Sequence, residues 1–234
     1  MTGGAGTPAV SVIVPVYNSE PFLAEAIRSI LRQGCPGLEI IVVNDGSTDR
    51  SEEIARGFPQ VALTLRQENS GPSAARNRGI ERSRAEIVTF LDADDLWPEG
   101  SRRGLVATLA ENPQAGVVQG LTSDFWPPDA RGARPTLAAP GRPRLSFNVG
   151  GAVFRRQVFD RVGLFDESLR YGEDLDFLFR VREHGVTRLV VERVAVLYRR
   201  HKDQLRRDEE TKQCVWPRLL KKSLERQRNS FPGR

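Results

Sequence analysis

Cysteine and long apolar runs are both scarce in this chain of 234 residues. Its two cysteines, Cys35 and Cys214, lie far apart and lack the CxxC spacing, so the sequence indicates neither a disulfide framework nor a zinc site and fits a reducing compartment. No segment approaches the ~20 apolar residues of a membrane-spanning helix, and the N-terminal MTGGAGTPA lacks the basic flank and apolar run of a signal peptide. These absences predict a cytoplasmic globular protein.

Several ligand-binding signatures are also missing. The GGAG stretch precedes the first apolar run and no G-x-G-x-x-G follows it, which argues against dinucleotide oxidoreduction, and there is no G-x-x-x-x-G-K-[ST] phosphate loop. The arginines are scattered rather than gathered with stacking aromatic residues, so we expect no nucleic-acid partner. The formal net charge of +5, from 35 basic and 30 acidic residues, permits an anionic partner but selects none.

What the sequence does contain is a regular alternation of two patterns. The β-branched runs VSVIVPV, LEIIVV, VALTL and AEIVTFL predict buried strands. The segments between them predict helices, the first with Ser19 as its cap and Gly34 as its stop. This order predicts an α/β fold with a mostly parallel sheet and helices on both faces.

A polar cluster follows each of the four predicted strands: PVYN, NDGS, NSGPSAARN and DADD. The carboxyl ends of parallel strands meet at one edge of a sheet, which is where ligands of such sheets bind. Asp45 ends the second strand at this edge. In the third cluster, NSGPSAARN, the turn at Gly71 offers backbone N–H groups to an anion, and Arg76 offers a guanidinium. The sequence therefore predicts one binding edge.

The acidic cluster Asp92, Asp94 and Asp95 follows the fourth strand with no basic residue in TFLDADDLWP. Two carboxylates about 6 Å apart repel by roughly 2–3 kcal/mol at an effective dielectric near 20, so we expect a compensating ligand. Carboxylate oxygens suit Mg²⁺ or Mn²⁺, and a cation held there would also bridge phosphates. A simple acidic turn before the next helix, with Asp95 in it, is the alternative reading.

Four linked motifs, VSVIVPVYN, IIVVNDGSTD, NSGPSAARNRG and FLDADD, resemble in order and spacing those of the family 2 glycosyltransferases, and the resemblance continues through GGAVFRRQVFDRVGLFDESLRYGEDLDFLFR to His201. It implies a GT-A fold, which is a Rossmann-like single domain, here with a C-terminal helical tail. It also implies inverting sugar transfer from a nucleoside-diphosphate sugar, with UDP expected ahead of dTDP and GDP.

The resemblance assigns roles to residues that match the family's nucleotide-sugar pocket, metal site and catalytic pair. These are Pro15, Tyr17, Asp45, Gly71, Arg76 and Asp92 for the nucleotide sugar; Asp94, Asp92 and His201 for Mn²⁺ or Mg²⁺; and Asp174 and Glu173 for catalysis. Asp174 is the expected general base, and Glu173 is expected to orient or stabilise. The chain departs from the family at Asn44, where an acid often precedes the DGS motif.

The same resemblance divides the chain into segments. We expect residues 1–9 to form a disordered N-terminus, 10–125 a nucleotide-sugar-binding half, 126–146 a flexible Pro-rich loop, 147–201 an acceptor and catalytic half, and 202–234 a C-terminal helical tail. Nothing in the sequence selects the acceptor, so a glycan, a lipid carrier, a protein and a small molecule all stay open.

The tail WPRLLKKSLERQRNSFPGR is basic with interspersed leucines. Packing on the domain or on a partner chain, as in a homodimer, is favoured, and a peripheral contact with an anionic membrane at its inner face is the alternative. Two other functions compete with sugar transfer: a catalytically inactive nucleotide-sugar-binding regulatory module, and a metal-dependent phosphohydrolase. The second is disfavoured because its acidic motif would follow the first strand rather than the fourth.

Overall fold

The computed structural model describes residues 9–125, 142–200, 215–226 and 228. Its elements occur along the chain as β1 (Val10–Val16), α1 (Leu23–Leu31), β2 (Leu38–Asp45), α2 (Ser51–Arg56), β3 (Val61–Gln67), α3 (Pro72–Arg82), β4 (Ile87–Phe90), α4 (Ser101–Glu111), β5 (Ala115–Phe125), the 3₁₀ turn η1 (Val149–Gly151), β6 (Ala152–Arg155), α5 (Gln157–Val162), α6 (Glu173–Glu183) and β7 (Thr187–Arg199). A further helix covers residues 215–226, which we call the C-terminal helix.

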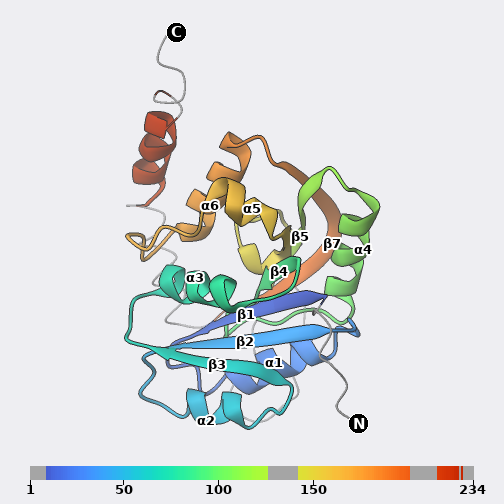
Figure 1. Ribbon diagram of the computed structural model, residues 1–234, viewed down its shortest axis with the longest axis vertical. Coiled ribbons are helices and arrows are strands. Elements are labelled where there is room, and N and C mark those ends of the chain that lie inside the picture. Colours follow the sequence, from blue (N-terminus) through green and yellow to red (C-terminus); the bar gives the residue numbers. More distant parts are fainter. Residues whose placement is uncertain (1–8, 126–141, 201–214, 227, 229–234) are drawn as a thin grey trace.

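The strands form one sheet in the order β3-β2-β1-β4-β6-β5-β7 (Figure 1). Neighbouring strands run parallel except at β6, which is antiparallel to both β4 and β5. The prediction of an α/β fold with a mostly parallel sheet is confirmed. In the described part of the chain, no helix is both long enough and apolar enough to cross a membrane.

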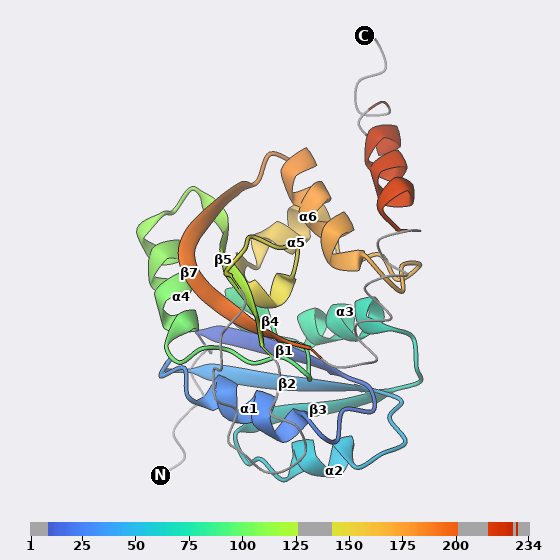
Figure 2. The ribbon, with the colours of Figure 1, turned by 180° about the vertical axis from the view of Figure 1, so that it is seen from behind.

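Each face of the sheet carries its own hydrophobic core, because successive side chains of a strand point to opposite faces. On β1, Ile13 packs with α3, α5 and α6, whereas Val12 and Val14 pack with α1 and α2. Figures 1 and 2 show α3 on one side of the sheet and α1 and α2 on the other. The predicted placement of helices on both faces is thus confirmed.

Helix α3 lies very close to the sheet, and a glycine makes this approach possible. A Cβ atom added to Gly79 would lie 2.4 Å from Cγ2 of Ile13 on β1, well inside van der Waals contact. The close packing fixes where the polar N-terminal half of α3, which includes Arg76, meets the carboxyl ends of the strands.

One local prediction is wrong. Ser19 does not cap the first helix: α1 begins at Leu23 without a side-chain cap, and the Ser19 hydroxyl donates to the carbonyl of Tyr17 at 3.1 Å instead. In α6, Phe177 is fully buried against Phe154 of β6 and Phe159 of α5.

Some predicted features lie outside the described residues. They are the N-terminus up to residue 8, most of the Pro-rich segment (residues 126–141), and residues 201–214 with His201.

Candidate active site

The carboxylate of Asp45 lies at the end of β2 and organises the turn that precedes α3. It accepts hydrogen bonds from Nε2 of Gln67 and from the backbone N–H groups of Ser70 and Gly71, each at 2.8 Å. Gly71 has a φ of 91°, a left-handed value that favours glycine, and an added Cβ would meet no atom within 4 Å. The start of α3 is therefore an open backbone surface held in place by Asp45.

A hollow of about 520 Å³ adjoins this carboxylate. It is lined by Gly46, Arg66, Gln67, Glu68 and Asn69. Gln67 connects the hollow directly to Asp45, because its side-chain amide donates to that carboxylate.

Pro15 and Tyr17 lie at the same edge of the sheet. Pro15 pairs with Val43 in the parallel β1–β2 ladder, and Tyr17, just after β1, is 52% exposed. The tyrosine therefore offers an accessible ring next to the end of β2, where Asp45 lies.

Arg76 of α3 is the centre of a buried ion cluster. Its side chain is 2% exposed, and its guanidinium contacts Oδ1 of Asp92 at 2.7 Å, Oε1 of Glu173 at 2.8 Å and Oδ1 of Asp174 at 3.0 Å. The stretch TFLDADDLWP contains no basic residue, but the guanidinium of Arg76 supplies positive charge at Asp92. The compensating charge comes from a different helix, which only the fold brings to Asp92.

Asp174 lies in the first turn of α6, and its two oxygens have different surroundings. Oδ2 accepts a hydrogen bond from the backbone N–H of Val149 at 3.0 Å. Oδ1 is buried and makes the ionic contact with Arg76 without hydrogen-bond geometry. Burial raises the pKa of Asp174 to about 7, with the charges of Glu173 and Asp92 acting in the same direction, while Arg76 and the Val149 N–H oppose the shift.

Asp95 is buried, and its carboxylate binds other parts of the protein. Its carboxylate is 1% exposed and accepts from the backbone N–H of Arg199 at 3.0 Å and from Nδ2 of Asn148 at 3.3 Å. Burial, together with the neighbouring charges of Asp94 and Asp92, raises its pKa well above the usual value. Asp95 thus ties the turn after β4 to β7 and to the loop before η1.

Arg199, at the end of β7, holds the same turn from its other side, and no motif in the sequence indicates this role. Its Nε donates to the main-chain carbonyl of Asp94 at 2.7 Å and its Nη2 to Glu25 at 2.6 Å. The guanidinium also lies over the rings of Phe22 and Phe125, 5.1 and 4.7 Å from their centroids.

The side chains of the acidic turn suit a divalent cation that also binds phosphates of a substrate. Within the described ranges, no group of three or more His, Cys, Asp or Glu side chains could hold a metal ion. Asp92 is 31% exposed although one of its oxygens binds Arg76, and Asp94 is partly buried beside it. Mg²⁺ is commonly bound by one or two carboxylates plus substrate phosphates, so this pair of side chains suits a cation shared with a diphosphate.

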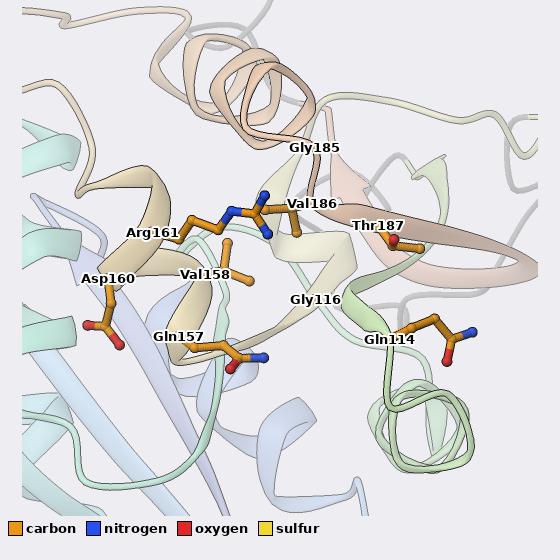
Figure 3. Close-up of a pocket in the computed structure, with 9 residues that line it drawn as sticks. All are labelled: Gln114, Gly116, Gln157, Val158, Asp160, Arg161, Gly185, Val186 and Thr187. Atoms are coloured by element: carbon orange, nitrogen blue, oxygen red, sulfur yellow. The ribbon is translucent and has the colours of Figure 1, made fainter.

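A second hollow of about 550 Å³ lies away from these residues (Figure 3). It opens between α5 and the starts of β5 and β7, with Gln157, Arg161 and Thr187 in its wall. None of the residues selected from the sequence lines it.

Comparison with known proteins adds an independent line of evidence. The sequence model of glycosyl transferase family 2 matches residues 11–165. The chain is 37% identical over 189 residues to the uncharacterized glycosyltransferase EpsJ of Bacillus subtilis, a match that covers 73% of this chain and 55% of EpsJ. The chain spans about half the length of the curated relatives it matches.

Solved structures share the fold. S. aureus TarS 1–349 in complex with UDP-GlcNAc superimposes with a TM-score of 0.69 at 24% identity, covering 83% of this chain and 59% of that one. The mannosyltransferase PcManGT from Pyrobaculum calidifontis, in complex with GDP-Man and Mn²⁺, gives a TM-score of 0.65 at 24% identity, with 82% and 57% covered. At this level of identity the likeness establishes the GT-A fold.

Proposed function

The chain belongs to glycosyl transferase family 2, and from this membership we propose that it transfers a sugar from a nucleoside-diphosphate sugar to an acceptor hydroxyl with inversion. A UDP-sugar is the proposed donor. Support comes from the shared fold with TarS, whose structure holds UDP-GlcNAc, while the GDP-Man complex of PcManGT makes GDP the alternative to test.

We assign donor binding to residues 10–125. Asp45 and the open backbone at Gly71 adjoin the hollow beside β2 and β3, which has room for a nucleoside. Pro15 and Tyr17, at the end of the neighbouring strand β1, are assigned to the same donor site, and Asp92 at the end of β4 would meet the ribose. The N–H groups of Ser70 and Gly71 already bind Asp45, so it is the positive end of the α3 helix dipole that favours a bound anion.

The observation that carries the proposal is the environment of Asp174. A general base works best when its pKa lies near the operating pH, and burial raises the pKa of this carboxyl to about 7. In the proposed step, Asp174 takes the proton of the acceptor hydroxyl, and the oxygen attacks the anomeric carbon from the face opposite the nucleotide. The bond from that carbon to the diphosphate breaks, and the nucleoside diphosphate leaves with its electron pair.

Arg76 and Glu173 position this base. The guanidinium binds Glu173 and Asp174 together and also Asp92, so it fixes the distance between the acceptor side and the donor side of the site. Residues 147–201, which contain the catalytic pair and the Val149 N–H, form the proposed acceptor half.

Asp94 and Asp92 are the side chains that would hold Mn²⁺ or Mg²⁺ together with the donor diphosphate, and His201, beyond the described residues, is a further proposed ligand. A cation bound there would act as a Lewis acid that neutralises charge on the departing diphosphate. The bond from Arg199 to the Asp94 carbonyl holds the turn that carries both carboxylates.

We also propose a cytoplasmic location with a peripheral membrane contact. The two widely separated cysteines fit a reducing compartment. The basic tail with its interspersed leucines fits a contact with an anionic membrane surface.

Release of nucleoside diphosphate tests the proposed function. The protein would be incubated with UDP-, GDP- and dTDP-sugars, Mn²⁺ and a panel of glycan, lipid-linked and small-molecule acceptors. We expect Asp174→Asn to lower turnover by at least ~10²-fold, in line with the loss of a general base, while donor binding measured by calorimetry persists. Asp160→Asn, an exposed carboxylate on α5, is the matched control and should keep wild-type turnover.

Two results would remove the assignment. Equal turnover in Asp174→Asn and wild type would exclude Asp174 as the base. Donor binding without transfer to any acceptor, in wild type as in the variant, would favour the inactive regulatory module.

A further inference from the structure

The C-terminal helix has one face fixed against the rest of the protein. Leu219 is fully buried and packs with Leu169 and Leu175. Lys222 forms an ion pair with Asp166, and Arg226 binds Glu183 at 2.7 Å. These contacts set the rotation of the helix and therefore determine which side chains face away from the domain.

The side of the helix next to this buried face carries exposed apolar side chains. Trp216, Leu220 and Leu224 are 43%, 53% and 48% exposed and follow one another at four-residue spacing, so they lie along one side of the helix. Phe147 extends this stripe, because its ring lies 5.7 Å from that of Trp216, and Leu145 is two residues further along. We call these five residues the apolar patch.

The apolar patch stands out from the rest of the surface. Of the eight large hydrophobic side chains that are exposed in the described part of the chain, three lie along this helix, Phe147 packs on Trp216, and Leu145 is close to Phe147 in sequence. Contiguous exposed apolar surface on a soluble domain marks an interaction site.

Exposed basic side chains accompany the apolar patch. Residues 216–234 contain six basic side chains and one acidic side chain, a net charge of +5 that equals the net charge of the whole chain. Two of the six, Lys222 and Arg226, are paired with Asp166 and Glu183. Arg218 and Lys221 in the C-terminal helix, and Arg228 two residues after Arg226, are exposed.

The apolar patch begins beside the candidate active site. Phe147 precedes Val149 by two residues, and the Val149 N–H binds the carboxylate of Asp174. Phe147 also packs on Phe179 of α6, the helix that begins with the catalytic pair. Whatever covers the patch therefore comes close to the proposed acceptor side.

We propose that the apolar patch and the basic residues around it dock on the surface of an anionic lipid bilayer. Apolar side chains with a tryptophan on one side of a helix, flanked by lysine and arginine, are the combination that inserts shallowly at the headgroup boundary and is attracted by anionic lipid. Trp216 suits this boundary because its ring is apolar and its indole N–H is polar. A protein partner would explain the leucines but would not require the exposed basic side chains of Arg218, Lys221 and Arg228 beside them.

Co-sedimentation with vesicles tests this inference on the full chain. Vesicles of phosphatidylcholine alone would be compared with vesicles that also contain phosphatidylglycerol, at low and high salt. We expect binding only to the anionic vesicles, weakened by salt because the charges at the surface are screened. The emission of Trp216 should shift to shorter wavelength on binding, and Trp216→Phe should abolish that shift.

Paired variants separate the apolar and the charged contributions. Leu220→Ser with Leu224→Ser removes exposed side chains only, and should weaken vesicle binding by roughly 10-fold or more. Arg218→Glu with Lys221→Glu should do the same at low salt. Val190→Ser, an equally exposed apolar side chain on β7, is the matched control and should bind as wild type does.

Three results would overturn the inference. They are no co-sedimentation of the wild-type protein with anionic vesicles, binding that the double serine variant retains in full, and a homodimer in solution that the double serine variant dissociates, which would make a second copy of the chain the occupant. The outcome is independent of the proposed catalysis, because vesicle binding is measured without donor or acceptor.

Discussion

Nη1 of Arg76 on α3 and Oδ1 of Asp174 on α6 lie 3.0 Å apart, although β4, β5 and β6 separate the two helices in sequence. The same guanidinium binds Asp92 at 2.7 Å. One buried cation therefore connects the proposed donor side of the site to the proposed base. Its charge opposes the rise in the pKa of Asp174, which burial and two neighbouring carboxylates cause.

The pH dependence of activity should report this balance. Because Asp174 must be ionised to act as the base, kcat/KM is expected to rise with pH through an apparent pKa of about 7. Glu173→Gln removes a negative charge that disfavours the ionised form, so the rise should move to lower pH by about one unit. Steady-state kinetics from pH 5 to 9 would check this, and an unshifted profile in Glu173→Gln would contradict the assignment.

Asp174 should also make the stability of the protein depend on pH. A carboxyl whose pKa is raised by folding contributes stability that is fully present below the unfolded pKa, near 3.8, and is lost as the pH rises through the folded pKa of about 7. Asp174→Asn removes this titration. The stability of this variant relative to wild type should therefore be greater at pH 8 than at pH 5. The difference in the free energy of unfolding, variant minus wild type, should increase by about 1–3 kcal/mol between the two pH values.

Urea denaturation at the two pH values measures this difference. Asp160→Asn serves as the control, since that carboxylate is exposed on α5, and its difference from wild type should be the same at both pH values. A pH-independent effect of Asp174→Asn would mean that the folded protein does not raise the pKa of this group.

Arg199→Lys should loosen the turn that carries the acidic cluster. A lysine ammonium lacks the forked geometry by which Nε and Nη2 of Arg199 reach the Asp94 carbonyl and Glu25, and it has no planar group to stack on the rings of Phe22 and Phe125. We expect a loss of about 1–3 kcal/mol in the free energy of unfolding and a KM for the donor that rises more than kcat falls.

The matched control for Arg199→Lys is Arg56→Lys. Arg56 is 68% exposed and pairs with Glu52 at the surface, so its substitution should change stability by less than about 0.5 kcal/mol. Wild-type stability and donor KM in Arg199→Lys would show that the turn does not depend on the guanidinium.

Gly79→Ala should displace α3 from the sheet. The added methyl group would lie 2.4 Å from Cγ2 of Ile13, and overpacking of this kind typically costs about 1–3 kcal/mol. Because Arg76 lies on the same helix, donor binding should weaken as well.

A double-mutant cycle with Ile13→Ala identifies the cause of that loss. Removing Cγ2 makes room for the new methyl group, so the double variant should be less destabilised than the two single variants predict together. Additive effects would show that Gly79→Ala acts in some way other than through contact with Ile13.

The local features of this protein follow closely from its sequence. The β-branched run ending at Val16 forms β1, and the polar residues after each of the first four strands lie at one edge, because hydrophobic period and strand direction are local properties. The motif resemblance also led to the family, which the comparisons confirm. Asp45, Asp92 and Asp174 were selected on that basis, and their roles stay predictions.

Only the tertiary structure decided which charges meet. Arg76 lies 97 residues before Glu173 in the sequence. No local pattern could show that α3 places Arg76 against the first turn of α6. The same holds for Arg199, which reaches Asp94 because the long β7 strand crosses the domain to the turn after β4. Electrostatic interactions depend on distance in space and on burial. The pKa of Asp174 therefore could not be predicted from the sequence, because its burial and its charged neighbours result from the packing of the strands and helices.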